Sequence, residues 1–269
     1  MKRAIAIMLA VFMLLSVCSC GSDTANVEDF AEVTHAATPC DVDTTGKVKI
    51  MCAGDSLTAG YRKTNAYRNY LADQLIDNGY QGTTCFVGPF DSPTDLCPEG
   101  YRRLYAYGGN TIPGLQGQLS TAMSCDPDII ILMIGTNDLA GFLLNEEVEK
   151  QYRDLIRDIL EYNPDVYLFL GNPLPGTDTA HTYVTEGTRI AWMRQFIEKL
   201  CEEKTANGYN VNFVNFSPSA IDWTVEDWDK AVTDHVHPSA TGNVKVANQW
   251  YNAIKPTIDS IIEAKGYDA

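Results

Sequence analysis

The chain has 269 residues, of which 45% are hydrophobic and 10% aromatic, and its formal net charge is −15. This length and composition favour one folded domain with a sizeable core and exclude a disordered chain. The acidic balance disfavours a nucleic-acid-binding protein, because phosphate binding needs clustered Lys and Arg. It also disfavours adsorption to anionic lipid, and it favours a neutral or weakly charged ligand.

The amino terminus has the pattern of a targeting segment. Lys2 and Arg3 precede an uncharged run over residues 4–15. That run has signal-peptide length and is short of the ~20 residues that a membrane-spanning helix needs. We therefore predict that residues 1–19 are a signal peptide and do not belong to the fold.

The end of this segment resembles a bacterial lipoprotein signal, in which a small residue precedes the cysteine to be lipidated. Cys20 follows Ser19 and is the better candidate, whereas Cys18 follows the bulkier Val17. The alternative is ordinary secretion with cleavage nearby. Both readings predict a location outside the cytoplasm, either as a periplasmic or cell-surface lipoprotein or as a secreted protein. Membrane contact would then come only through a lipid anchor at Cys20.

Residues 20–45 are small, polar and acidic and predict a flexible tether, followed by a single domain over residues 46–269. In this domain apolar runs alternate with helical patterns, which is typical of a parallel sheet covered by helices on both faces. Strands are expected at 48–53, 84–87, 128–134, 166–170 and 211–216. The most apolar of them, 128–134, is expected to be central.

Helices are expected from Tyr67 to a left-handed cap at Asn78-Gly79, then at 113–123, 146–161, 186–203 and 240–264. Pro256 is expected to kink or divide the last of them. The tyrosine- and proline-rich segment 88–109 reads as a long loop. The predicted fold is a three-layer α/β/α domain whose five-stranded parallel sheet has the flavodoxin-like order 2-1-3-4-5.

Cysteine spacing leaves several pairings open. Cys85 and Cys97 flank a loop rich in Pro and Asp, and we expect them to form a disulfide. Sequence alone cannot choose among the other pairings of the six cysteines that follow the signal, which are Cys40, Cys52, Cys85, Cys97, Cys125 and Cys201. Cys52 lies in the first strand and reads as a small buried thiol. A structural zinc site is disfavoured, because no Cys-x-x-Cys pair accompanies these residues.

The first expected strand ends at Gly54-Asp55-Ser56-Leu57. Ligands of open α/β sheets bind at the carboxyl ends of the strands, so Ser56 is placed as a nucleophile would be. A turn followed by a helix cap explains the same residues equally well. Three further motifs fall where such a sheet gathers its loops: 108–111 ahead of a helix, 135–138 after the central strand, and 234–238 before the last helix.

These four motifs stand in the order typical of one superfamily. They are Gly54-Asp55-Ser56-Leu57, Gly108-Gly109-Asn110-Thr111, Gly135-Thr136-Asn137-Asp138 and Asp234-His235-Val236-His237-Pro238. From about Lys47 to its end the chain resembles the SGNH (GDSL) hydrolases. More closely, it resembles the carbohydrate esterase family 3 acetylxylan esterases in Tyr67-Arg68-x-x-Leu71, Asn78-Gly79-Tyr80 and Phe86-Val87-Gly88. It departs from them at 103–107, where that subfamily has a His-Glu-Gly-like segment.

The resemblance implies Ser56 as nucleophile, His237 as general base and Asp234 as the carboxylate that orients the imidazole. It implies an oxyanion hole made by the backbone N–H groups of Ser56 and Gly109 and the side chain of Asn137. The chemistry is consistent, since ester cleavage by serine creates an oxyanion that preorganised donors stabilise. No metal or organic cofactor is implied. No Gly-x-Ser-x-Gly elbow is present, so an α/β-hydrolase is disfavoured.

Alternatives exist for several of these residues. His235 and His237 could form a metal pair, or His235 could be the base. Asn137 could cap a turn, and Gly109 could serve a tight turn alone. Asp55 and Asp138 are expected to hold their loops through backbone hydrogen bonds. Candidates for stacking on a sugar ring are Tyr107, Trp223 and Trp228, although filling of the core explains the two tryptophans equally well.

The sequence thus predicts a serine esterase that removes acyl groups, above all acetyl, from a carbohydrate such as acetylated xylan. A lipolytic or thioester-cleaving GDSL esterase is the alternative within enzymes. From another class, a non-catalytic surface lipoprotein that binds sugar would use the same scaffold without turnover.

Overall fold

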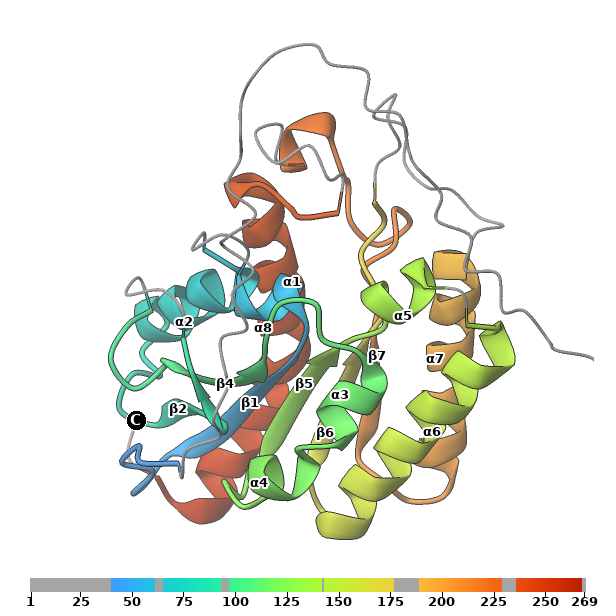
Figure 1. The fold of residues 1–269 in the computed structure, drawn as a ribbon. Helices are drawn as coiled ribbons and strands as arrows, with labels where there is room; N and C mark the ends of the chain where they lie inside the picture. Colours follow the sequence, from blue (N-terminus) through green and yellow to red (C-terminus); the bar gives the residue numbers. More distant parts are fainter. Residues whose placement is uncertain are drawn as a thin grey trace, which may run out of the picture. The chain divides into compact units, whose positions relative to one another are not determined.

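Each apolar run that the sequence assigns to a strand forms one in the computed structural model, which describes residues 40–60, 65–92, 97–141, 143–176, 189–228 and 236–267. These strands are β1 (Val48–Gly54), β2 (Thr84–Val87), β5 (Ile129–Met133), β6 (Tyr167–Gly171) and β7 (Val211–Val214). All of them run parallel, and their pairings are β2 with β1, β1 with β5, β5 with β6, and β6 with β7. The predicted class, a parallel α/β sheet, is confirmed (Figure 1).

The prediction of five strands is wrong, because the described residues form a seven-stranded sheet in the order β3-β4-β1-β5-β6-β7 with β2 also paired to β1. The two further strands, β3 (Phe90–Asp91) and β4 (Arg103–Ala106), lie in the segment that was expected to be a loop. β2 stops opposite Met51, and β4 then pairs in parallel with Ala53 and Gly54. β4 therefore occupies the edge of β1 that β2 leaves free.

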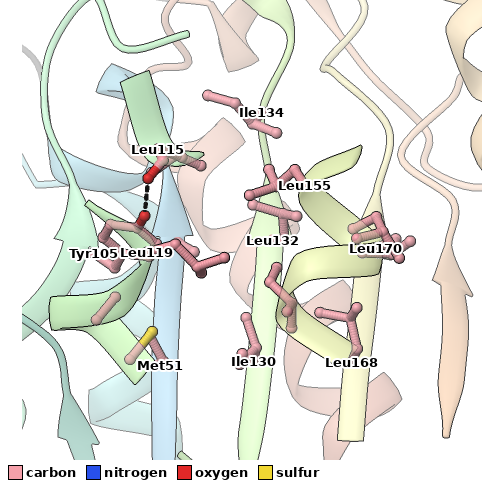
Figure 2. Close-up of a cluster of buried hydrophobic side chains, with 14 of the residues drawn as sticks. Met51, Tyr105, Leu115, Leu119, Ile130, Leu132, Ile134, Leu155, Leu168 and Leu170 are labelled. Atoms are coloured by element: carbon pink, nitrogen blue, oxygen red, sulfur yellow. Dashed lines mark hydrogen bonds between the residues drawn. The ribbon is translucent and has the colours of Figure 1, made fainter. Parts of the chain in front are cut away.

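Side chains of the central strand alternate between two apolar clusters, one on each face of the sheet. Ile130, Leu132 and Ile134 point to one cluster, whereas Ile129, Ile131 and Met133 point to the other. Because both faces are covered, β5 is uniformly apolar, as expected for a central parallel strand. Figure 2 shows part of the first cluster, where strand residues meet Leu115, Leu119 and Leu155 and where the Tyr105 hydroxyl donates to the carbonyl of Leu115.

The helices divide between these two faces and complete three layers. The cluster of Figure 2 is covered by α3 (Ile112–Gln116), α4 (Leu119–Met123), α6 (Asn145–Tyr162) and α7 (Arg189–Ala206). The opposite face is covered by α1 (Ser56–Ala59), α2 (Tyr67–Asp77) and α8 (Ala240–Lys265). The short helix α5 (Thr136–Ala140) follows β5, and a 3₁₀ turn, η2, spans Val225–Asp227. None of the helices in the described ranges is long and apolar enough to cross a membrane.

Two helix ends follow local sequence signals. α2 closes as predicted, since Gly79 has φ +87° and the N–H of Tyr80 donates to the carbonyl of Leu75 at 2.8 Å. The single helix expected at 113–123 is instead two short helices, α3 and α4, that meet at Gly117. Gly114 and Gly117 both fall inside the expected helix, and each glycine costs about 1 kcal/mol relative to alanine there.

Pro256 does not divide the last helix, which runs from Ala240 to Lys265 with the proline inside it. Proline removes the hydrogen bond to the carbonyl four residues earlier, that of Asn252. Asn252 and Pro256 are both exposed, so water can replace the missing donor. Ile254 and Ile258 are fully buried on either side of the proline and hold both halves of α8 against the sheet.

The packed chain begins before residue 46, the boundary expected from composition. Cys40 and Val42 pack on the cluster of Figure 2, and Asp41 lies 3.7 Å from the guanidinium of Arg103. The apolar residues of this stretch are too few for composition to reveal the packing. Their contacts come from parts of the chain far away in sequence.

The expected Cys85–Cys97 disulfide is wrong, because both cysteines are free thiols in the structure. Cys85 points into the cluster of Figure 2, whereas Cys97 belongs to the cluster on the opposite face of the sheet. The sheet therefore separates the two sulfurs, and the Cys97 thiol donates instead to the carbonyl of Tyr101 at 2.7 Å. Cys52 is fully buried, as expected.

Candidate active site

The turn that carries Ser56 is built where β1 ends against β5. A Cβ atom on Gly54 would lie 2.2 Å from the carbonyl oxygen of Met133, so only glycine allows this approach. Asp55 then caps α1, since its Oδ1 accepts from the N–H of Leu57 at 3.0 Å. Ser56 becomes the first residue of α1 and is partly exposed at the carboxyl end of the strand.

His237 lies directly against this serine. Its Nε2 is 2.7 Å from the Oγ of Ser56, although the two residues are 181 positions apart in the chain. Pro238 forms an isolated antiparallel bridge with Trp228, and the N–H of Ser239 donates to the carbonyl of Asp227 at 2.7 Å. These contacts fix the backbone on the carboxyl side of His237, immediately before α8 begins.

Asp227, which the sequence analysis did not assign to the site, anchors the segment that follows His237. Its side chain is buried and accepts from the ammonium of Lys245 at 2.6 Å and from the N–H of Thr224 at 2.6 Å. Burial opposes ionisation, but these hydrogen bonds, that of Lys245 first, hold the pKa of Asp227 below its usual value. The ionised carboxylate thus anchors the turn at Asp227, and the backbone carbonyl of the same residue accepts from the N–H of Ser239.

Asn137 joins the site through a second residue that the sequence did not assign, Asn110. The Nδ2 of Asn137 donates to the carbonyl of Asn110 at 2.7 Å, and the Nδ2 of Asn110 donates to the carbonyl of Gly54 at 3.2 Å. Asn110 is 2% exposed. It therefore ties the loop after β4 to the end of β1 and holds the amide of Asn137. Its position directly after Gly109 and before a helix is the signal that could have found it.

Asp138, Asp55 and Gly109 fix the backbone of these loops. Both carboxylate oxygens of Asp138 accept from the N–H of Ile112, at 3.2 and 3.3 Å, and burial raises the pKa of this carboxyl. The interpretation that Asp55 and Asp138 hold their loops through backbone hydrogen bonds is confirmed. Gly109 has φ +73°, a conformation that favours glycine, so the turn itself requires it.

Arg68 and Arg189 hold the loops of the site through hydrogen bonds from their guanidinium groups. Arg68 is fully buried on α2, and its Nε donates to the carbonyl of Thr58 in α1 at 3.0 Å. Arg189, at the start of α7, donates to the carbonyls of Leu139 and Leu143 at 2.7 Å each and so holds the chain that follows Asn137. The other donors of Arg68 reach the side chains of Cys97 and Ser92, so each guanidinium makes several directed hydrogen bonds that a lysine could not reproduce.

The predicted sugar-stacking residues separate into two groups. Tyr107 is partly buried beside the loop after β4, with its ring edge-to-face against Phe90 at 5.9 Å. Trp223 and Trp228 are 5% and 3% exposed and pack on each other at 5.2 Å. The prediction that these two tryptophans stack on a sugar is wrong, because their faces are covered by the apolar cluster beside α8. Asp234, His235 and Cys20 lie outside the described residues.

Burial of Asp55 predicts a measurable pH dependence of stability. The side chain is fully buried, and this burial raises its pKa from 3.8 to about 7. The folded protein therefore keeps a proton that the unfolded chain releases, so this group's stabilising contribution is lost as the pH rises from about 4 to about 7. We therefore compare the unfolding free energy of Asp55→Asn with that of the parent. We expect this difference to shift in favour of Asp55→Asn by roughly 2 to 4 kcal/mol as the pH rises between these values.

Urea unfolding of both proteins at pH 4.5 and 7.5 measures this change, with the exposed Asp165→Asn as the matched control. A difference between Asp55→Asn and the parent that stayed constant with pH would contradict the argument.

Comparisons with known proteins show the family to which the chain belongs. The profile of the GDSL-like lipase/acylhydrolase family matches residues 52–245. A multidomain esterase of Ruminococcus flavefaciens is 28% identical over 232 residues, which cover 78% of this chain and 29% of that protein. The chain thus spans less than a third of that relative's length.

Two solved structures share the fold. A family 3 carbohydrate esterase of Clostridium thermocellum has a TM-score of 0.66 and 26% identity, over 80% of this chain and 98% of the esterase. One of the same family from Talaromyces cellulolyticus has a TM-score of 0.66 and 21% identity, over 79% and 99% of the two chains. The chain belongs to the GDSL-like lipase/acylhydrolase family, the SGNH hydrolases, as the four motifs indicated.

Proposed function

We propose that this protein is a serine esterase that removes acetyl groups from a carbohydrate such as acetylated xylan. The observation that carries the proposal is the 2.7 Å contact between the Oγ of Ser56 and the Nε2 of His237. A serine hydroxyl is a weak nucleophile at its free pKa and needs a base within hydrogen-bond reach. Both residues are partly exposed, so a substrate can approach them.

In the first half of the reaction the Oγ of Ser56 attacks the carbonyl carbon of the ester while the Nε2 of His237 takes the serine proton. Negative charge develops on the carbonyl oxygen. The backbone N–H groups of Ser56 and Gly109 and the second N–H of the Asn137 amide would stabilise it, since the first is used on Asn110. His237 then gives its proton to the departing sugar hydroxyl, which leaves an acetyl group on Ser56.

In the second half His237 takes a proton from water, and the resulting nucleophile attacks the acyl-enzyme. Acetate leaves and the proton returns to Ser56, so the enzyme is regenerated. Asp234 is proposed to accept from the Nδ1 of His237, which would favour the tautomer that leaves Nε2 able to accept the serine proton. This role follows from its spacing, three residues before His237.

The carbohydrate substrate is supported by the comparisons and by charge. The relatives include a family 3 carbohydrate esterase at 26% identity and a multidomain esterase at 28%. A net charge of −15 repels acidic substrates and leaves a neutral polysaccharide unaffected. An acetyl group needs only a shallow pocket, whereas a lipolytic or thioester-cleaving enzyme needs an extended apolar groove for its acyl chain.

Acyl-chain preference tests the proposal. We expect kcat/KM for 4-nitrophenyl acetate to exceed that for the octanoate ester at least about tenfold, which corresponds to 1.4 kcal/mol of transition-state binding. Acetate release from acetylated xylan, mannan and pectin then identifies the polymer, with the Ser56→Ala protein as the blank. A preference for octanoate would favour the lipolytic alternative. An unreactive Ser56 toward a fluorophosphonate, together with sugar binding, would favour a non-catalytic binding protein.

A further inference from the structure

The start of α8, directly after His237, is hydrogen-bonded to the η2 turn at several points. The Oγ of Ser239 donates to the carbonyl of Glu226 at 2.6 Å. The N–H of the same serine donates to the carbonyl of Asp227 at 2.7 Å. His237 lies two residues before this serine, so its position relative to Ser56 depends on how η2 sits against α8.

The two elements approach each other so closely that a side chain would not fit between them. A Cβ atom on Gly242 would lie 2.2 Å from the carbonyl oxygen of Asp227 and 2.9 Å from the Cβ of Pro238. The Nδ2 of Asn243 adds a hydrogen bond to the carbonyl of Pro238 at 3.1 Å. The backbone here therefore has little freedom, and a displacement of η2 would be passed on to His237.

A buried carboxylate and an ammonium connect η2 and α8 through their side chains. The Nζ of Lys245 lies 2.6 Å from the Oδ2 of Asp227, and it also donates to the carbonyl of Asp222. The side chain of Asp227 is 2% exposed and that of Lys245 is 31% exposed. The carboxylate also accepts from the N–H of Thr224 at 2.6 Å. It therefore fixes both the start of η2 and the contact of η2 with α8.

We propose that Asp227 and Lys245 are positioning residues of the esterase, whose ion pair sets the distance between the Nε2 of His237 and the Oγ of Ser56. This inference rests on the proposed function. The pair acts on the backbone beside His237 and has no role on the substrate itself. Proton transfer between aligned groups is sensitive to such a distance, since a misplacement of ~1 Å can cost about 10²-fold in rate.

Removal of either charge tests the proposal. We expect Asp227→Asn and Lys245→Met to lower kcat for 4-nitrophenyl acetate about 10- to 100-fold, with KM within about twofold of the parent. Lys245→Arg should keep kcat within about threefold, because a guanidinium can also pair with the carboxylate. The matched control is Lys255→Met, which removes an ion pair with Asp259 on the same helix and should leave kcat unchanged. A loss through KM alone, or an equal loss in the control, would overturn the proposal.

The double variant Asp227→Asn/Lys245→Met separates positioning from stability. It removes both charges, and neutral replacement of a buried pair often restores stability. We expect its Tm to return toward that of the parent while kcat stays as low as in the single variants. In a His237→Ala background, Asp227→Asn should cause no further loss of kcat, because Asp227 acts only through His237. Recovery of kcat together with Tm, or a full further loss in that background, would overturn the proposal.

NMR of the imidazole nitrogens gives a readout that needs no substrate. The chain has four histidines, and the spectrum of His237→Ala assigns the signals of His237. In the parent, Ser56→Ala should shift the Nε2 signal, because it removes the partner at 2.7 Å. In an Asp227→Asn background this shift should be largely absent. A parent that hydrolyses no acetyl ester would refute the proposed function, whereas an equal Nε2 shift in both backgrounds would overturn the positioning role.

Discussion

Replacing Ser56 by alanine is expected to lower kcat for 4-nitrophenyl acetate by about 10⁴- to 10⁶-fold, because the nucleophile and the acyl-enzyme are both lost. His237→Ala should cost a similar factor, since in the proposed mechanism the two side chains, 2.7 Å apart, act as one catalytic unit. The double variant should therefore be little worse than either single variant. Initial rates under saturating substrate, corrected for buffer hydrolysis, measure all three.

The exposed Ser120→Ala is the matched control for Ser56, since it removes the same hydroxyl from helix α4 on the opposite face of the sheet. Thermal melting should show that every variant folds. A Ser56→Ala protein that retained the parent rate would refute the serine mechanism. Strict additivity of the Ser56 and His237 losses would contradict their action as a pair.

Asn137→Ala is expected to lower kcat about 10²- to 10³-fold with little change in KM, because an oxyanion-hole donor acts on charge that develops only in the transition state. The amide of Asn137 is held in place by its 2.7 Å hydrogen bond to the carbonyl of Asn110, and its second N–H is the donor proposed for the oxyanion. Asn137→Asp keeps the size of the side chain, but it replaces the donor by a charge that repels the oxyanion. Its activity should therefore be at least as low.

The exposed Asn212→Ala on β7 is the control for loss of an asparagine. The distinction from a purely structural role lies in the split between kcat and KM, measured beside Tm. If Asn137→Ala lost activity in proportion to a lower Tm, or through KM alone, the oxyanion assignment would be wrong.

The central part of the fold was predictable because its signals are local. The apolar run from Val48 ends at a glycine, and the structure ends β1 there at Gly54. The left-handed cap at Gly79 was visible as Asn-Gly after a helical period. The same holds for the residues of the candidate site that stand at strand ends, Ser56 and Asn137, since parallel strands place their carboxyl ends on one edge.

The errors share a different cause. β4 is four residues long and was hidden in a segment rich in proline and tyrosine, yet its pairing with Ala53 and Gly54 brings the loop that follows it to the end of β1, where Asn110 donates to the carbonyl of Gly54. Trp223 and Trp228 look like ligand-stacking residues in sequence and are buried in the structure. Whether an aromatic face or an edge of a strand is covered depends on elements far away along the chain, so no local pattern reports it.

The sequence by itself determined the alternation of strands and helices and the chemical type of each residue at the strand ends, because periodicity and turn chemistry act over a few neighbouring residues. Only the tertiary structure decided which of these residues contact one another. It brought Ser56 to His237 and Asn137 to Asn110, and it placed the sheet between Cys85 and Cys97. These contacts join residues from different elements, and their distances follow from the packing of the whole sheet.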